Sequence, residues 1–162
     1  MGGGGSDSPS IGDIGDLVER AKRALRERQE TGRRNVFISF ALEDLNEVNL
    51  LRGQARNDNV PIEFNDWSIS DPINSEKAPY IKQKISDRIS QCSVTVVYLS
   101  DNATQSSWVG WEIAESIRQG KEVIGVYPGQ TKPQNLPEAV RTHGLQCVPW
   151  SKLAETIAEL GQ

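Results

Sequence analysis

The sequence predicts an α/β fold, because short apolar runs rich in β-forming residues alternate with amphipathic segments along residues 36–160. The expected strands are residues 36–40, 60–64, 93–100, 122–127 and 146–150. Proline falls in the second and the fifth of them, as Pro61 and Pro149, and proline is tolerated at the edge of a sheet. Right-handed crossovers then favour a parallel sheet in the order 2-1-3-4-5, in a flavodoxin-like three-layer sandwich.

The segments between the strands have the periodicity of helices with one apolar face. We expect helices over residues 45–56, from Pro79 through residue 89, over residues 107–118 and near residues 137–141, followed by a final helix. Proline suits the first turn of a helix, Gly120 suits the end of one, and Ser151 suits the cap of the last one.

The first 34 residues of the sequence differ in composition from the rest. Residues 1–13 are rich in glycine and predict a disordered linker or tag. From Ile14 to about residue 30, apolar side chains recur on one helical face and arginines on the other. This extra N-terminal helix, with its linker to residue 34, either packs on the domain or binds a partner. Residues 35–162 form the expected main domain.

Composition excludes several classes of protein. The formal net charge is −4, and no apolar run has the roughly 18 residues that a membrane span needs. Two cysteines and a single histidine predict neither a disulfide scaffold nor a metal site. The acidic balance argues against nucleic acid as the partner. With no secretory signal at the N-terminus, the expected localisation is cytoplasmic.

The carboxyl ends of the first and third strands predict the position of a ligand site, because the strand order reverses between them. Trp108 and Glu112 reach this position on one face of the same helix. They suggest either a small pocket with a carboxylate or, more plainly, a core tryptophan and an acidic first-turn residue. Glu43, Asp44 and Asp101 also gather there, but the lysine of a receiver-type acidic site is missing after the fourth strand.

Several phrases of the sequence resemble TIR domains: NVFISFALED, SSWVGWEI, GKEVIGVY and, near the end, LPEAV with VPWS. The run from SVTVVYLS through WVGWEIAESIRQGKEVIGVY is more similar to the TIR-like subfamily that includes the Thoeris anti-phage sensor proteins. The resemblance extends over about residues 35–160, in the correct order.

The resemblance implies a bacterial immune enzyme that cleaves the nicotinamide–ribose bond of NAD and releases an ADP-ribose-derived product or signal. NAD is then a substrate, and neither a cofactor nor a metal is implied. Glu112 takes the place of the catalytic glutamate. The residues that would line the substrate site are Phe40, Ala41, Asp66, Trp67 and Trp108.

The resemblance also implies partners, namely further copies of the chain through the loop at residues 66–78 and a separate effector protein. Two positions depart from the family pattern. Ala41 and Leu42 stand where many NAD-cleaving members have basic or small polar residues, and Val109 replaces a usual cysteine.

Two other functions stay open from the sequence. One is a TIR-like module that assembles without turnover, and the other is a deoxyribosyltransferase-like enzyme, which the strand and helix phrases fit less well. For the enzyme, we expect a half-exposed Glu112 in a crevice that faces Phe40 and residues 66–74, with Trp108 in its wall.

Overall fold

A computed structural model describes residues 15, 17–19, 34–66 and 71–160. The chain divides into two units, Met1–Arg33 and Arg34–Gln162. In the first unit, residue 15 and residues 17–19 are helical. The rest of the helix expected from residue 14 to residue 30, and the expected linker over residues 1–13, lie outside the described residues. The fold below is that of the second unit.

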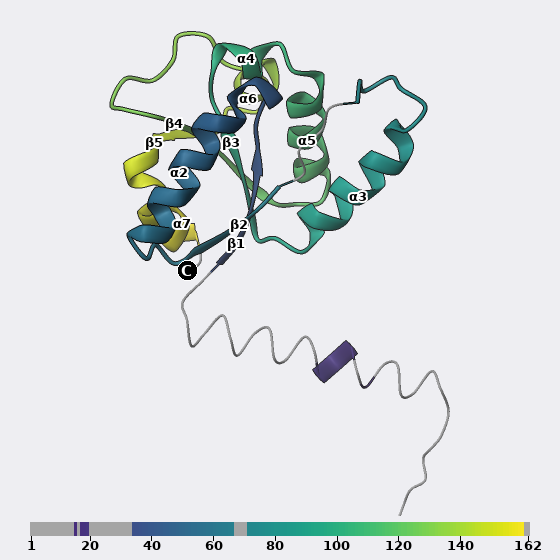
Figure 1. The fold of residues 1–162 in the computed structure, drawn as a ribbon, viewed down its shortest axis with the longest axis horizontal. Coiled ribbons are helices and arrows are strands. Elements are labelled where there is room, and N and C mark those ends of the chain that lie inside the picture. Colours follow the sequence, from purple (N-terminus) through teal and green to yellow (C-terminus); the bar gives the residue numbers. More distant parts are fainter. Residues whose placement is uncertain (1–14, 16, 20–33, 67–70, 161–162) are drawn as a thin grey trace, which may run out of the picture. The chain divides into compact units, whose positions relative to one another are not determined.

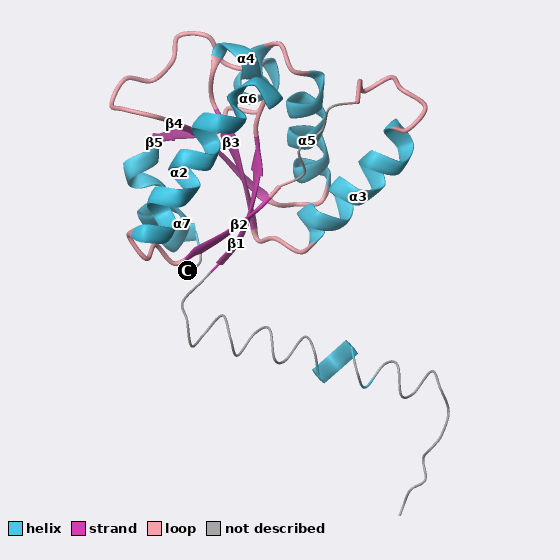
Figure 2. Cartoon of the chain, viewed as in Figure 1, coloured by secondary structure: helices cyan, strands magenta, loops and turns pink. Residues whose placement is uncertain are grey.

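The second unit is built on a five-stranded sheet (Figure 2). Its strands are β1 (Arg34–Ser39), β2 (Ile62–Asn65), β3 (Val94–Tyr98), β4 (Glu122–Tyr127) and β5 (Gln146–Pro149). All pairings are parallel and the order is β2-β1-β3-β4-β5. This confirms the expected order, with the two proline-marked strands at the edges.

Helices cover both faces of the sheet and complete the three layers (Figure 1). They are α2 (Leu45–Asn57), α3 (Ala78–Ser90), α4 (Asp101–Thr104), α5 (Ser107–Arg118), α6 (Glu138–Thr142) and α7 (Leu153–Leu160), with 3-10 turns at Leu42–Asp44 and Trp150–Lys152. In Figure 1, α2 and α7 lie on one side of the sheet and α3 and α5 on the other. We call these the α2/α7 face and the α3/α5 face.

Element boundaries differ from the expectation at a few positions, each for a local reason. β2 begins at Ile62, after Pro61 rather than around it, because proline has no N–H to donate to a neighbouring strand. The short helix α4 was not expected; the Ser100 hydroxyl caps it by accepting from the Ala103 N–H at 3.0 Å. Ser151 does not cap the last helix but lies within a 3-10 turn.

The alternation of side chains along the strands separates two hydrophobic cores. Val36 and Ile38 of β1 belong to the core that α2 and α7 cover. Phe37, between them, belongs to the core on the α3/α5 face. Because successive residues of a strand point to opposite faces, Ser39 follows Phe37 onto the α3/α5 face. This alternation decides which side of the sheet each candidate site residue occupies.

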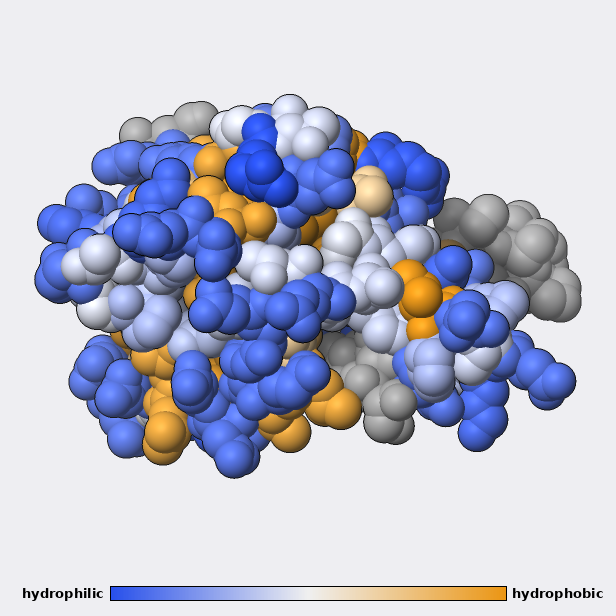
Figure 3. All heavy atoms as spheres, turned by 90° about the horizontal axis from the view of Figure 1, so that it is seen from above, coloured by the Kyte–Doolittle hydropathy of each residue, from blue (hydrophilic) through white to orange (hydrophobic). Residues whose placement is uncertain are grey.

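The end of the molecule where α4 and α6 lie is mainly hydrophilic, with hydrophobic residues in separate small groups (Figure 3). Within the described residues, no helix has the length and apolar content needed to cross a membrane.

Candidate functional site

Glu112 lies in the second turn of α5, the helix that packs across β1, β3 and β4. The helix begins at Ser107 because the Ser106 hydroxyl accepts a hydrogen bond from the Val109 N–H at 3.2 Å. From this start, Glu112 points into the α3/α5 face and is only 3% exposed. The expectation of a half-exposed glutamate is therefore wrong, because α5 turns this side chain towards the sheet rather than along the helix surface.

Ser39, the last residue of β1, is the hydrogen-bond partner of Glu112. Its hydroxyl donates to Glu112 Oε1 at 2.5 Å, and Ser39 itself is fully buried. One helical turn further on, the Ser116 hydroxyl lies 2.8 Å from Thr95 Oγ1 of β3. We call Ser39, Thr95, Glu112 and Ser116 the polar row; it runs through an otherwise apolar core.

Burial raises the pKa of Glu112 to about 8, and the charge on Asp66 adds to the rise while the Ser39 hydrogen bond opposes it. The Asp66 carboxylate is itself paired with Arg52 at 2.7 Å. At neutral pH most molecules therefore hold Glu112 protonated. A buried carboxyl group with a strongly raised pKa is a recognised mark of a functional site, because such a group is costly to keep in a core.

Trp108 connects α5 to the loop that follows β2. Its indole N–H donates to the carbonyl oxygen of Asp71 at 2.7 Å. The ring also meets Trp111 edge to face, with centroids 6.1 Å apart, and both rings pack against the core that contains Phe37. Trp108 thus anchors the described end of the loop at residues 66–78.

The other expected site residues occupy different surroundings. Phe40 packs against the core on the α2/α7 face, so the structure brings Ser39 rather than Phe40 against Glu112. Ala41 is buried at the turn after β1, and Asp66 pairs with Arg52 from α2. Trp67 lies outside the described residues.

Sequence reasoning missed Ser39, although one signal was available. A serine at an inward position of a buried strand needs a hydrogen-bond partner, because an unpaired buried hydroxyl is costly. The chain offers Glu112 as that partner only once the strand and the helix are placed together.

A second buried carboxylate, Asp44, joins the turns after β1 and β3. It is 4% exposed and accepts hydrogen bonds from the Ser100 hydroxyl at 2.5 Å and the Asn102 amide at 2.8 Å. Glu43 and Asp101, by contrast, are exposed. Among the described residues, no three His, Cys, Asp or Glu side chains gather into a possible metal site. Asp44 therefore holds two turns together.

The cysteines do not provide a nucleophile. Cys92, shortly before β3, and Cys147, in β5, are both free, as expected because these two strands are not neighbours. Burial raises the pKa of the Cys92 thiol to about 11 and raises that of Cys147 as well. Since the thiolate is the reactive form, both thiols are held in their unreactive state at neutral pH.

A parallel sheet in this order, with helices on both faces, places the second unit in the flavodoxin-like class of α/β domains. The model of the "Thoeris protein ThsB, TIR-like domain" family matches residues 37–133, which is more than half of the chain. The chain therefore belongs to the Thoeris ThsB TIR-like family. The matched region contains Ser39, Glu112 and the anchored loop.

The TIR domain of the Toll-related receptor TRR-2 from the lower metazoan Hydra magnipapillata aligns with a TM-score of 0.46 and 17% sequence identity. The alignment covers 69% of this chain and 82% of that chain. No curated protein matches the sequence.

Proposed function

We propose that this domain cleaves the nicotinamide–ribose bond of NAD, with Glu112 as the catalytic residue. The observation that carries the proposal is the buried carboxyl of Glu112, which Ser39 holds at 2.5 Å. Membership of a TIR-like family supports it. A domain that served only as a scaffold would gain stability from an apolar residue at this position, because an isolated buried carboxyl is unfavourable.

The chemistry fits a single carboxylate. When the bond between ribose C1′ and the nicotinamide nitrogen breaks, its electron pair leaves with nicotinamide, which becomes neutral and needs no proton. Positive charge develops on the ribose, as in glycoside hydrolysis. A carboxylate in a site that excludes water stabilises that charge strongly.

The raised pKa of Glu112 predicts that NAD binding is coupled to loss of the Glu112 proton. The nicotinamide ring of NAD carries a positive charge, and a positive charge near a carboxyl group favours its ionised form. Bound NAD would therefore release the proton that Glu112 holds in the free protein. Because kcat/KM reports groups of the free enzyme, we expect it to rise with pH up to about pH 8.

The same family membership supports a role in bacterial anti-phage defence, with the product acting as a signal for a separate effector protein. Self-association through residues 66–78 would assemble the active form. The hydrogen bond from the Trp108 indole N–H to the Asp71 carbonyl oxygen holds this part of the loop against α5. The alternative is an assembly module without turnover, and one observation supports an assembly surface here: Tyr80, in the first turn of α3, is 63% exposed.

The test measures nicotinamide release from NAD by the purified protein, over a range of protein concentrations that covers the monomer and its assemblies. The Glu112→Gln variant keeps the size of the side chain but loses its charge. We expect its turnover to fall by two to three orders of magnitude.

The matched control is Glu115→Gln, the same substitution one turn along α5. Glu115 faces Arg118 and Ser86 rather than Ser39, so this variant should keep its turnover within a few-fold. Equal rates in wild type and Glu112→Gln would overturn the catalytic assignment. Assembly without nicotinamide release in the wild type would establish the assembly module instead.

A further inference from the structure

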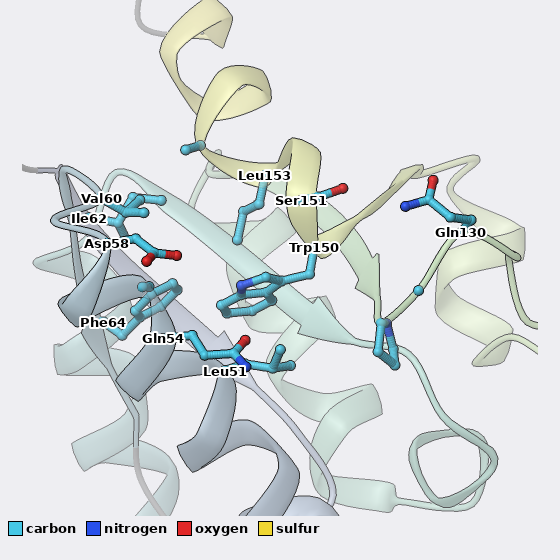
Figure 4. Close-up of a pocket in the computed structure, with 14 residues that line it drawn as sticks. Leu51, Gln54, Asp58, Val60, Ile62, Phe64, Gln130, Trp150, Ser151 and Leu153 are labelled. Atoms are coloured by element: carbon cyan, nitrogen blue, oxygen red, sulfur yellow. The ribbon is translucent and has the colours of Figure 1, made fainter.

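A cavity of about 450 Å³ opens on the α2/α7 face, on the other side of the sheet from Glu112. It lies between α2, β2 and the segments that follow β4 and β5 (Figure 4). Its size falls within the range of small-molecule sites. Nothing in the proposed NAD chemistry uses it.

Two aromatic rings form one wall of the cavity. Phe64 of β2 and Trp150, directly after β5, are stacked with centroids 5.5 Å apart and ring planes 21° from parallel. They come from the two opposite edges of the sheet and are both only half-buried. Flat ring surface that stays accessible favours a flat aromatic ligand, which stacks on it.

Polar side chains stand around the rings. Figure 4 shows Gln54 and Asp58 close to Phe64 and Trp150, with Gln130 at the other end of the cavity. All three polar side chains are exposed, and within the described residues none of them makes a hydrogen bond. They are free to bind a ligand, the two amides as donors or acceptors and Asp58 as an acceptor.

The charge of the cavity selects among aromatic ligands. Of the fourteen lining residues, all of them described, Asp58 alone carries a charge. A ligand with N–H donors gains a charge-assisted hydrogen bond from it. A phosphate would meet a negative charge with no lining cation to balance it, so a nucleotide is disfavoured relative to its nucleoside.

We propose that this cavity binds a planar heteroaromatic molecule that is neutral or cationic and carries N–H donors, of the kind found in purine bases and nucleosides. The ligand ring stacks on the open side of the Phe64–Trp150 pair, and Asp58 accepts from its amino group. This site is separate from the one that contains Glu112.

The experiment uses protein labelled with fluorotryptophan, in which fluorine NMR follows the tryptophans individually during titration with adenosine. The Trp150 signal, assigned with a Trp150→Phe variant, should shift, and those of Trp108 and Trp111 should not. N6,N6-dimethyladenosine, which lacks the N–H donors, and AMP, which adds a phosphate, should each bind several-fold more weakly.

Matched variants locate the interaction. Asp58→Asn should weaken adenosine binding about tenfold. It should also reduce the difference in affinity between adenosine and AMP, because the carboxylate no longer repels the phosphate. Glu122→Gln removes the same charge from an exposed position at the start of β4, the end away from the cavity. This variant should change neither the affinity for adenosine nor its difference from that for AMP. The Glu112→Gln variant should bind adenosine as the wild type does.

The proposal is overturned if adenosine leaves the Trp150 signal unmoved. It is also overturned if Asp58→Asn and Glu122→Gln behave alike, or if AMP binds more tightly than adenosine. Loss of adenosine binding in Glu112→Gln would assign the ligand to the other site. Loss of turnover in that variant with adenosine binding retained leaves the cavity proposal standing, because the two sites are tested separately.

Discussion

The two faces of the sheet place their polar groups in opposite ways. On the α3/α5 face, the polar row lies inside the core, and Glu112 and Ser39 are almost inaccessible. On the α2/α7 face, the core is apolar, and the polar side chains stand around an open cavity. The same types of residue are thus buried on one face and solvated on the other.

This difference has energetic consequences. A buried carboxyl group must either stay protonated or find a partner, which is why burial raises the pKa of Glu112 to about 8. The side chain of Asp58, by contrast, is exposed to water. The first face therefore couples protonation to stability and to the proposed chemistry, whereas the second offers a site whose changes leave the fold intact.

The largest effect on stability should come from Trp108→Ala. This change removes a large side chain from the α3/α5 core together with the bond to Asp71. We expect the free energy of unfolding to fall by about 3 kcal/mol. Trp108→Phe keeps most of the packing and loses only the indole N–H, so the free energy of unfolding should fall by only about 1 kcal/mol.

Chemical denaturation measures both variants, and hydrogen exchange of the Asp71 region separates them. If Trp108→Phe leaves the exchange of residues 71–78 unchanged, the indole does not anchor the loop.

Stability should also depend on pH through Glu112. The folded state holds this proton up to about pH 8, whereas the unfolded chain loses it near pH 4.5. The folded state therefore binds more protons between these values, and the free energy of unfolding should fall as pH rises from about 5 to 8. We expect a loss of about 3 kcal/mol in the wild type.

The Glu112→Gln variant has no proton to lose there, so its curve should be flatter over the same interval. Glu115, whose pKa the Arg118 hydrogen bond lowers to about 2, contributes only under acid conditions. Parallel curves for wild type and variant between pH 5 and pH 8 would contradict the raised pKa.

Ser39→Ala should have a smaller, more specific effect. It removes the hydrogen bond that opposes the rise in the pKa of Glu112. The rising limb of kcat/KM for NAD should then move to higher pH, with a loss of about tenfold at pH 7. Thr95→Val removes a hydroxyl from the same polar row that contacts Ser116 rather than the Glu112 carboxyl. An equal movement of the limb in both variants would show that Ser39 has no special relation to Glu112.

The smallest effect is expected on the α2/α7 face. Asp58→Asn changes an exposed side chain with no ion pair among the described residues, so the free energy of unfolding should change by less than about 0.5 kcal/mol. A loss above about 1 kcal/mol, measured by denaturation, would mean that Asp58 supports the fold, and the contrast between the faces would be weaker than described.

Local patterns were enough to predict much of this fold. The bounds of α5 and β4 agree with the expectation. In each element the apolar residues recur with a clear period, and a residue at the boundary, such as the cap Ser106, marks where the element begins or ends. The order of the strands followed from right-handed crossovers in a flavodoxin-like sheet, and the two prolines supported it by marking the edge strands. The helix α4 was missed, because four residues are too few to show a period.

The site was predicted less completely, because its contacts are tertiary. Glu112 and Trp108 were found from their spacing on one helix. Their partners, Ser39 and the carbonyl of Asp71, are 73 and 37 residues away in the chain. The predicted exposure of Glu112 was wrong for the same reason, because the rotation of α5 against the sheet decides whether this side chain is buried. Phe40 was assigned from the resemblance, and alternation at the end of β1 directs its side chain to the other face.

The first strand and the last helix of the domain are joined by one side chain. The guanidinium of Arg34, at the start of β1, donates to the carbonyl oxygen of Ile157 in α7 at 2.8 Å. Leu153 and Ile157 of that helix complete the core on the α2/α7 face. During synthesis, β1 leaves the ribosome long before α7 does. Until α7 follows, the apolar side chains of Val36 and Ile38 lack the helix that packs over their core. The domain therefore finishes folding only after α7 has emerged, and until then this apolar face of a nascent chain stays uncovered.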